Sequence, residues 1–110
     1  MMQQELVMYT RTFPCPFVRS AQKVLQQYNV AYREIYIDQD PQARARVETW
    51  TGFAAVPTLI LARPGEDFPI GEPVVLPPGS SPRGINRGTM ITEPSEEQLI
   101  AWLRQQGVIA

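Results

Sequence analysis

The sequence contains no histidine and only one cysteine, Cys15. Without histidine, a single chain cannot build a Ser-His-Asp or Cys-His catalytic group, nor a zinc site with histidine ligands. A lone cysteine also excludes an internal disulfide, and a metal site made only of thiolates would need a second chain or a small thiol. Cysteine chemistry in this chain is therefore limited to one thiol, and no metal ligands are predicted.

The sequence also lacks an excess of charge of either sign, and it lacks long hydrophobic runs. Ten basic and eleven acidic residues give a net charge of −1, so nucleic-acid binding has little electrostatic support. No apolar run approaches the roughly 20 residues that span a bilayer, and the N-terminus lacks the basic start and apolar core of a secretory signal. We therefore expect a protein of the cytoplasm, a compartment in which thiols stay reduced. We also expect that it binds neither nucleic acid nor a membrane.

What is present suits one globular domain over residues 1–110, expected to be a monomer. Four short runs are apolar or alternate between apolar and polar residues, and turn-forming residues bound them, which predicts strands. The predicted strands are Glu5–Tyr9, Ala31–Asp38, Val56–Ala62 and Pro73–Pro77.

Capping residues and helical spacing predict three helices between these strands. The first begins at Pro16, the second has Asp40 as its cap and ends before Gly52, and the third opens with a capping box of Ser95 and Gln98. The buried faces are predicted to contain Val18, Ala21, Leu25, Tyr28, Ala43, Val47, Trp50, Leu99, Trp102 and Leu103.

The resulting order is β-α-β-α-β-β-α, which predicts an α/β fold with a four-stranded mixed sheet flanked by three helices. The first two crossovers imply parallel pairing, and the third and fourth strands lie close enough in sequence for an antiparallel pair. Residues 77–94 are dense in turn formers and predict a long loop, either functional or partly mobile. Arg83 and Arg87 within it are either a docking patch for an acidic partner or solvated charges.

Cys15 lies between the first predicted strand and the first predicted helix. A helix N-terminus presents unpaired N–H groups and the positive end of the helix dipole, both of which stabilise a thiolate over a thiol. Arg11, four residues earlier, adds positive charge. The alternative is that Cys15 is a buried and inert small side chain, as many single cysteines are.

Five segments, in order, resemble the glutaredoxin family, which has a thioredoxin fold. They cover roughly residues 5–61 and read "YTR" from Tyr9, "CP" from Cys15, "AQKVL" from Ala21, "DPQARARVETWTG" from Asp40 and "VPTL" from Val56. Val18 stands where dithiol members have a second cysteine, so the chain resembles a monothiol variant with the motif C-P-F-V. Where the family has Gly-Gly and an acidic turn before the last helix, this chain has residues 77–94.

The resemblance implies that Cys15 is the nucleophile and that glutathione is the co-substrate. Arg11 would meet a glutathione carboxylate, Pro16 and Phe17 would line the substrate site, and Val56 would expose its backbone before a cis-Pro57. A solvated charge is the alternative for Arg11, and simple core packing is the alternative for Phe17. Arg44 and Arg46 are two apart in the second helix and so do not share a face, which leaves one of them able to reach the site, and simple surface charge is the alternative.

Three functions are compatible with these residues. The first is a thiol–disulfide oxidoreductase in which Cys15 removes glutathione from glutathionylated proteins and a second glutathione, or a similar thiol, resolves the mixed disulfide. The second is an iron–sulfur cluster held between two chains by two Cys15 thiolates and two glutathiones, although Phe17 and Val18 would crowd it. The third is a non-enzymatic thioredoxin-fold module that binds partners through residues 77–94.

Overall fold

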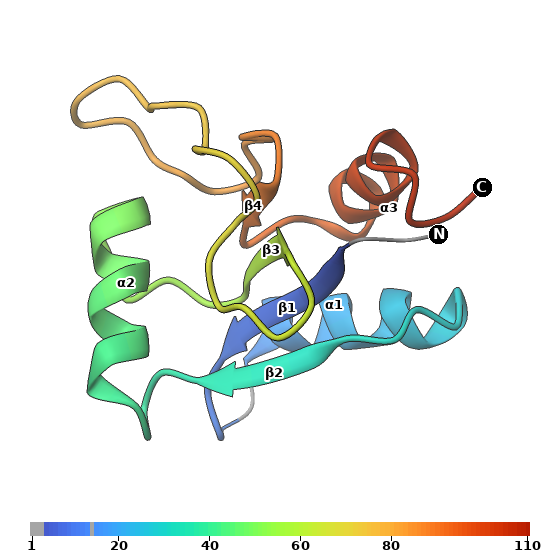
Figure 1. Cartoon of the computed structure of the whole chain (residues 1–110), viewed down its shortest axis with the longest axis horizontal. Coiled ribbons are helices and arrows are strands. Elements are labelled where there is room, and N and C mark those ends of the chain that lie inside the picture. The colour runs from blue at the N-terminus through green and yellow to red at the C-terminus, as the bar shows by residue number, and fades with distance from the viewer. Residues whose placement is uncertain (1–3, 14) are drawn as a thin grey trace.

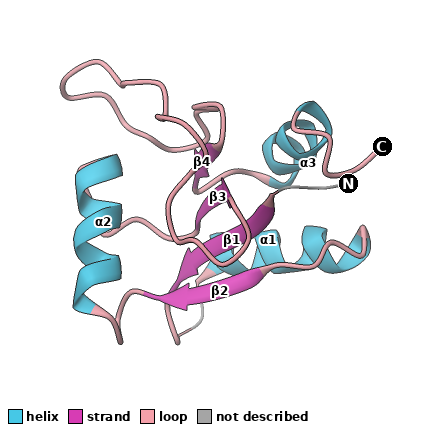
Figure 2. Ribbon diagram, viewed as in Figure 1, coloured by secondary structure: helices cyan, strands magenta, loops and turns pink. Residues whose placement is uncertain are grey.

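The computed structural model describes residues 4–13 and 15–110, and its elements follow the predicted order (Figures 1 and 2). The strands are β1 (Glu5–Thr10), β2 (Arg33–Tyr36), β3 (Thr58–Ala62) and β4 (Met90–Thr92). The helices are α1 (Pro16–Gln27), α2 (Pro41–Thr51) and α3 (Glu96–Gln105).

The four strands form one mixed sheet in the order β2-β1-β3-β4. Strand β1 pairs in parallel with β2, whereas β3 runs antiparallel to both β1 and β4. Helices α1 and α3 pack against each other, and α2 lies apart from them at one end of the sheet (Figure 1). The α/β fold with a four-stranded mixed sheet and three helices is confirmed, and it is thioredoxin-like.

The prediction that the second crossover also joins parallel strands is wrong. Strand β2 ends with Tyr36 beside Thr10, and β3 begins with Thr58 beside Tyr9, so both positions lie at the same end of the sheet. Helix α2 crosses this end instead of carrying the chain back along the sheet (Figure 1). The chain therefore enters β3 from the end at which it left β2, and β3 must run antiparallel.

The fourth strand was predicted at Pro73–Pro77, and this is also wrong. Val74 and Val75 there are 62% and 83% exposed, and the two flanking prolines have no N–H for a sheet ladder. The actual β4 lies within the predicted long loop, where all of Met90–Thr92 is buried. The antiparallel pairing of the last two strands is confirmed, but their connection is long rather than short.

The connection between these strands, residues 63–89, is named here the β3–β4 segment. It contains six of the eleven prolines of the chain, so its carbonyls outnumber its backbone N–H groups. Side chains from β1, β2, α3 and the segment itself donate hydrogen bonds to those carbonyls and hold the segment in place. The pairs are Tyr9 with Asp67, Arg33 with Glu66, Thr89 with Ile70, Arg87 with Val74, and Trp102 with Gly88.

The predicted caps of α2 and α3 are confirmed. The Asp40 carboxylate accepts hydrogen bonds from the N–H groups of Gln42 and Ala43, and Gly52 ends α2 with a φ of +83°. The Ser95 hydroxyl accepts from the N–H of Gln98, and the Gln98 side chain accepts in return from the N–H of Ser95. These local hydrogen bonds satisfy N–H groups that no helix can satisfy by itself.

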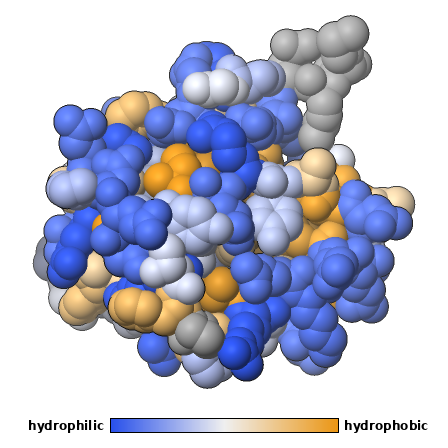
Figure 3. Space-filling view, turned by 90° about the horizontal axis from the view of Figure 1, so that it is seen from below, coloured by the Kyte–Doolittle hydropathy of each residue, from blue (hydrophilic) through white to orange (hydrophobic). Residues whose placement is uncertain are grey.

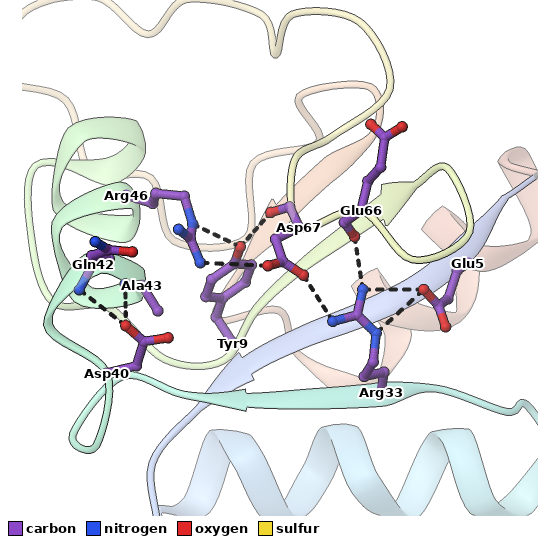
Figure 4. Close-up of polar contacts among 9 residues, drawn as sticks. All are labelled: Glu5, Tyr9, Arg33, Asp40, Gln42, Ala43, Arg46, Glu66 and Asp67. Carbon is purple, nitrogen blue, oxygen red and sulfur yellow. Dashed lines mark hydrogen bonds and ion pairs between the residues drawn. The ribbon is translucent and has the colours of Figure 1, made fainter.

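A polar network ties the start of the β3–β4 segment to the sheet (Figure 4). Arg33 bridges Glu5 at 3.1 Å and Asp67 at 2.8 Å, while Arg46 from α2 donates to the Tyr9 hydroxyl at 3.2 Å. The hydrogen bond from Arg33 lowers the pKa of Glu5, and burial raises the pKa of Tyr9. Glu5 therefore stays a carboxylate and Tyr9 stays a hydroxyl donor near neutral pH.

The two tryptophans differ in burial, although both were predicted to be core residues. Trp102 is 1% exposed within the core, whereas Trp50 is half-buried and meets the Tyr9 ring edge-on at 5.4 Å between centroids. Hydrophilic residues cover most of the surface in Figure 3, and hydrophobic ones show in separate small areas. Among the described residues, no helix combines the length and apolar character needed to cross a bilayer.

Candidate functional site

Cys15 is the residue that caps the N-terminus of α1, as the sequence predicts. Its backbone is extended, with a φ of −142°, and its carbonyl accepts the first hydrogen bond of the helix from Arg19 at 2.9 Å. The thiol is free, half-buried and makes no capping hydrogen bond. Pro16 follows as the first helical residue, and Val18 is 4% exposed within the core. The site therefore presents one thiol, and the position three residues later faces inward.

Residues 54–57 lie next to the end of β1, from which the Cys15 loop departs. The pairing of Tyr9 with Thr58 sets this position, and the peptide bond between Val56 and Pro57 is cis, as predicted. Within the described part of the chain, neither the N–H nor the C=O of Val56 has a hydrogen-bond partner. The Pro57 carbonyl, in contrast, accepts from the N–H of Glu93 at 2.7 Å. The backbone of Val56 is thus the unpaired part of this edge.

Arg11 reaches from the Cys15 loop to this edge. Its guanidinium donates to the Ala54 carbonyl at 2.9 Å and lines a hollow of about 280 Å³. Arg44 of α2 lines the same hollow, while Arg46 turns away to the polar network of Figure 4. The sequence left open whether either arginine approaches the site; Arg44 lines this hollow with an exposed side chain that pairs with Glu48 at 3.7 Å.

Asp38 fixes the beginning of the Cys15 loop. Its carboxylate accepts hydrogen bonds from both the N–H of Thr12, at 3.1 Å, and the Thr12 hydroxyl. The hydrogen bond from that hydroxyl lowers the pKa of Asp38, so the side chain is a carboxylate at neutral pH. The loop that carries Arg11 and leads to the thiol is thereby tied to the end of β2.

Phe17 lies one residue beyond Pro16 and is half-buried. The guanidinium carbon of Arg83 lies 5.0 Å from the centroid of its ring, within cation–π distance. The Arg83 Nε also donates to the Glu93 carboxylate at 2.7 Å. The β3–β4 segment therefore places a cation next to the start of α1.

Arg83 and Arg87 do not form one docking patch, so this interpretation is wrong. The side chain of Arg83 is 62% exposed, whereas Arg87 is only 6% exposed. Arg87 donates to the carbonyls of Trp50 and Val74, and burial lowers its pKa. No carboxylate pairs with it in the described part of the chain, so Arg87 acts as a donor that joins the β3–β4 segment to α2.

Sequence reasoning missed the contacts among Phe17, Arg83 and Glu93. These residues lie on α1, in the β3–β4 segment and directly after β4, so no local spacing brings them together. Glu93 has a φ of +45°, which is uncommon outside glycine, and no sequence pattern signals this either. Among residues 4–13 and 15–110, no three acidic or cysteine side chains gather in a way that could hold a metal ion.

A model of the glutaredoxin family matches residues 6–63. The match begins in β1, includes Cys15 and the Val56–Pro57 bond, and stops one residue after β3. The β3–β4 segment and α3 lie almost entirely outside it. No curated protein was found to match the chain.

Proposed function

Since this chain belongs to the glutaredoxin family, we propose that it is a thiol–disulfide oxidoreductase that works with Cys15 alone and uses glutathione, or a similar small thiol, as co-substrate. The observation that carries the proposal is the position of Cys15. A free, partly accessible cysteine occupies the N-cap position of α1, directly before the first helical residue Pro16.

The proposed reaction is a pair of thiol–disulfide exchanges. The Cys15 thiolate attacks the glutathione sulfur of a glutathionylated protein, the protein thiolate leaves, and Cys15 keeps the glutathione as a mixed disulfide. A second glutathione thiolate then attacks this disulfide, which frees Cys15 and releases oxidised glutathione. Each step exchanges one S–S bond for another, so no further oxidant or reductant is required, and a reducing compartment such as the cytoplasm supplies the second thiol.

Two groups next to the end of β1, from which the Cys15 loop departs, support binding of a small peptide. The unpaired N–H and C=O of Val56 can pair with an extended peptide backbone, as an edge strand does. Arg11, at the hollow it shares with Arg44, offers a positive charge to a carboxylate of the same compound. Pro16, Phe17 and Pro57 are proposed to shape the surface between these groups.

The test is the reaction of the reduced protein with oxidised glutathione over a pH series, followed by intact mass. We expect one glutathione on the wild-type protein near neutral pH, none on Cys15→Ser, and release of the adduct when reduced glutathione is added. A matched control is Ser20→Ala, which alters another small side chain of α1 and leaves the thiol in place. Absence of the adduct until strongly alkaline pH would sink the proposal.

A further inference from the structure

The backbone around Arg83 fixes the position from which its side chain extends. Arg83 pairs with Thr92 in a short parallel bridge, and the N–H of Gly84 donates to the Thr92 carbonyl at 2.7 Å. A Cβ on Gly84 would lie 2.5 Å from the Gln98 side chain, which also forms the capping box of α3. The chain therefore passes close to α3 here, and Arg83 emerges from a fixed position.

Part of the Arg83 guanidinium is able to donate hydrogen bonds to a ligand. Its Nε binds Glu93 and its guanidinium plane lies near the ring of Phe17. Within the described residues, its two terminal nitrogens donate no hydrogen bond, and the side chain is 62% exposed. These nitrogens form the end of the guanidinium that binds a carboxylate through two parallel hydrogen bonds.

Arg83 also lines a second hollow, which shares Ala54 with the hollow of Arg11. This second hollow has a volume of about 340 Å³ and is bounded by Phe53, Ala55 and Pro82. Ala54 lines both hollows, so the Arg11 hollow and the Arg83 hollow flank the same short stretch of backbone. Between Phe13 at the first hollow and Phe17 beside Arg83, the chain carries Cys15. Arg83 therefore contacts Phe17, a residue two positions after the thiol, and Arg11 lies four positions before the thiol.

We infer that Arg83 binds a carboxylate of the thiol compound that reacts with Cys15, and that it is a specificity-determining residue supplied by the β3–β4 segment. The inference rests on the proposed function, because it names what the same site selects. A compound the size of an extended tripeptide spans about 10 Å, and in the inferred complex its sulfur lies at Cys15 while one of its carboxylates binds Arg83. Glu93 partly neutralises Arg83 and sets how strongly that carboxylate is held.

The test compares two disulfides in their rate of mixed-disulfide formation with Cys15. Oxidised glutathione carries carboxylates, whereas bis(2-hydroxyethyl) disulfide carries no charge. We expect Arg83→Met to slow the reaction with oxidised glutathione by about tenfold and to leave the reaction with the uncharged disulfide within about twofold of wild type. Arg83→Lys should give an intermediate rate with oxidised glutathione, since an ammonium cannot form the same paired contact.

A matched control is Arg63→Met, another exposed arginine of the β3–β4 segment, which should react with both disulfides as the wild-type protein does. If Arg83→Met slows both reactions equally, Arg83 acts on the thiol or the fold, and the inference is overturned. If Arg83→Met and wild type react equally well with oxidised glutathione, the inference fails while the proposed function stands. If the wild-type protein reacts with neither disulfide, the proposed function itself fails.

Discussion

Residues 5–62 and the β3–β4 segment reach a defined structure by different means. The first region pairs its backbone in β1, β2 and β3 and buries apolar side chains such as Leu59 and Val47, both with no exposed surface. In the β3–β4 segment, Val74 and Val75 are exposed, and side-chain donors from β1, β2, α3 and the segment itself hold the backbone carbonyls. The first region is stabilised by area removed from water, and the second by a few directed hydrogen bonds.

This difference predicts how far the effect of a destabilising substitution extends through the molecule. An apolar core residue contacts many neighbours, so its loss weakens the whole cooperative unit. A donor that satisfies one or two carbonyls stabilises only the chain that carries them, and the loss is limited to the free energy of opening that chain locally. Substitutions in the two regions should therefore differ in extent as well as in size.

The largest effect is expected from Leu59→Ala in β3. Leu59 has no exposed surface and pairs with Met8 and Ile91 on its two neighbouring strands. The change should lower the free energy of unfolding by about 2–5 kcal/mol, because it leaves a cavity in the core. Urea unfolding followed by circular dichroism measures it.

The control is Val75→Ala in the β3–β4 segment, at a side chain that is 83% exposed. It should change the free energy of unfolding by less than about 0.5 kcal/mol. Equal losses from the two variants would show that the β3–β4 segment belongs to the same cooperative core.

Arg87→Met is expected to lower stability less than Leu59→Ala does, and to affect mainly the β3–β4 segment. Methionine keeps much of the volume but removes the donors to the carbonyls of Trp50 and Val74, at a cost of about 1–3 kcal/mol. Amide hydrogen exchange should become faster at Val74, whose N–H donates to the Arg87 carbonyl, while the amides of β1 and β3 keep their protection. Arg63→Met serves as the control, and equal acceleration throughout the sheet would contradict the local assignment.

The smallest effect on stability is expected at Glu5, which links residues 5–62 to the β3–β4 segment. Its carboxylate accepts from Arg33 on β2 and from the N–H of Gly65 in the β3–β4 segment, and the hydrogen bond from Arg33 lowers its pKa below the ordinary 4.5. A carboxylate with a lowered pKa adds stability above its unfolded value and loses it as the pH falls through the folded value. We expect Glu5→Gln to be less stable than wild type by under about 1 kcal/mol at pH 7, since the pair is partly exposed.

That difference should shrink as the pH drops below 4.5, where the wild-type carboxylate also loses its charge. Urea midpoints of both proteins between neutral and acidic pH measure the change. A difference that stays constant down to acidic pH would mean that Glu5 acts through packing rather than through its charge.

The same contrast explains how much could be predicted from the sequence. Asp40, Pro41 and Gly52 mark both ends of α2 within one short stretch, and Ser95 with Gln98 marks the start of α3, so these boundaries were predictable. Strand β4 has three residues, too few to show a period, and the valines between Pro73 and Pro77 resemble a strand more closely. The direction of β3 follows from the path of α2 across the sheet end, which no local pattern encodes.

The candidate site likewise has one part that the sequence predicts and one part that it does not. The positions of Cys15 at the start of α1 and of the cis bond before Pro57 follow from short motifs in the stretch that matches the family. The contacts of Arg83 with Phe17 and Glu93 depend on where the β3–β4 segment returns to the sheet. Such contacts between distant parts of a chain require the fold to be known first.

The β3–β4 segment leaves and rejoins the sheet at one point, because Ile60 pairs with Met90 and the N–H of Leu61 donates to the Thr89 carbonyl. Each doubling of loop length costs only about 0.6 kcal/mol in closure entropy, so evolution can lengthen or trim a connection of this kind cheaply. The segment is in effect an exchangeable module. If Arg83 sets selectivity as we infer, one thiol scaffold can acquire new selectivity by replacing this segment, while the strands and Cys15 stay unchanged.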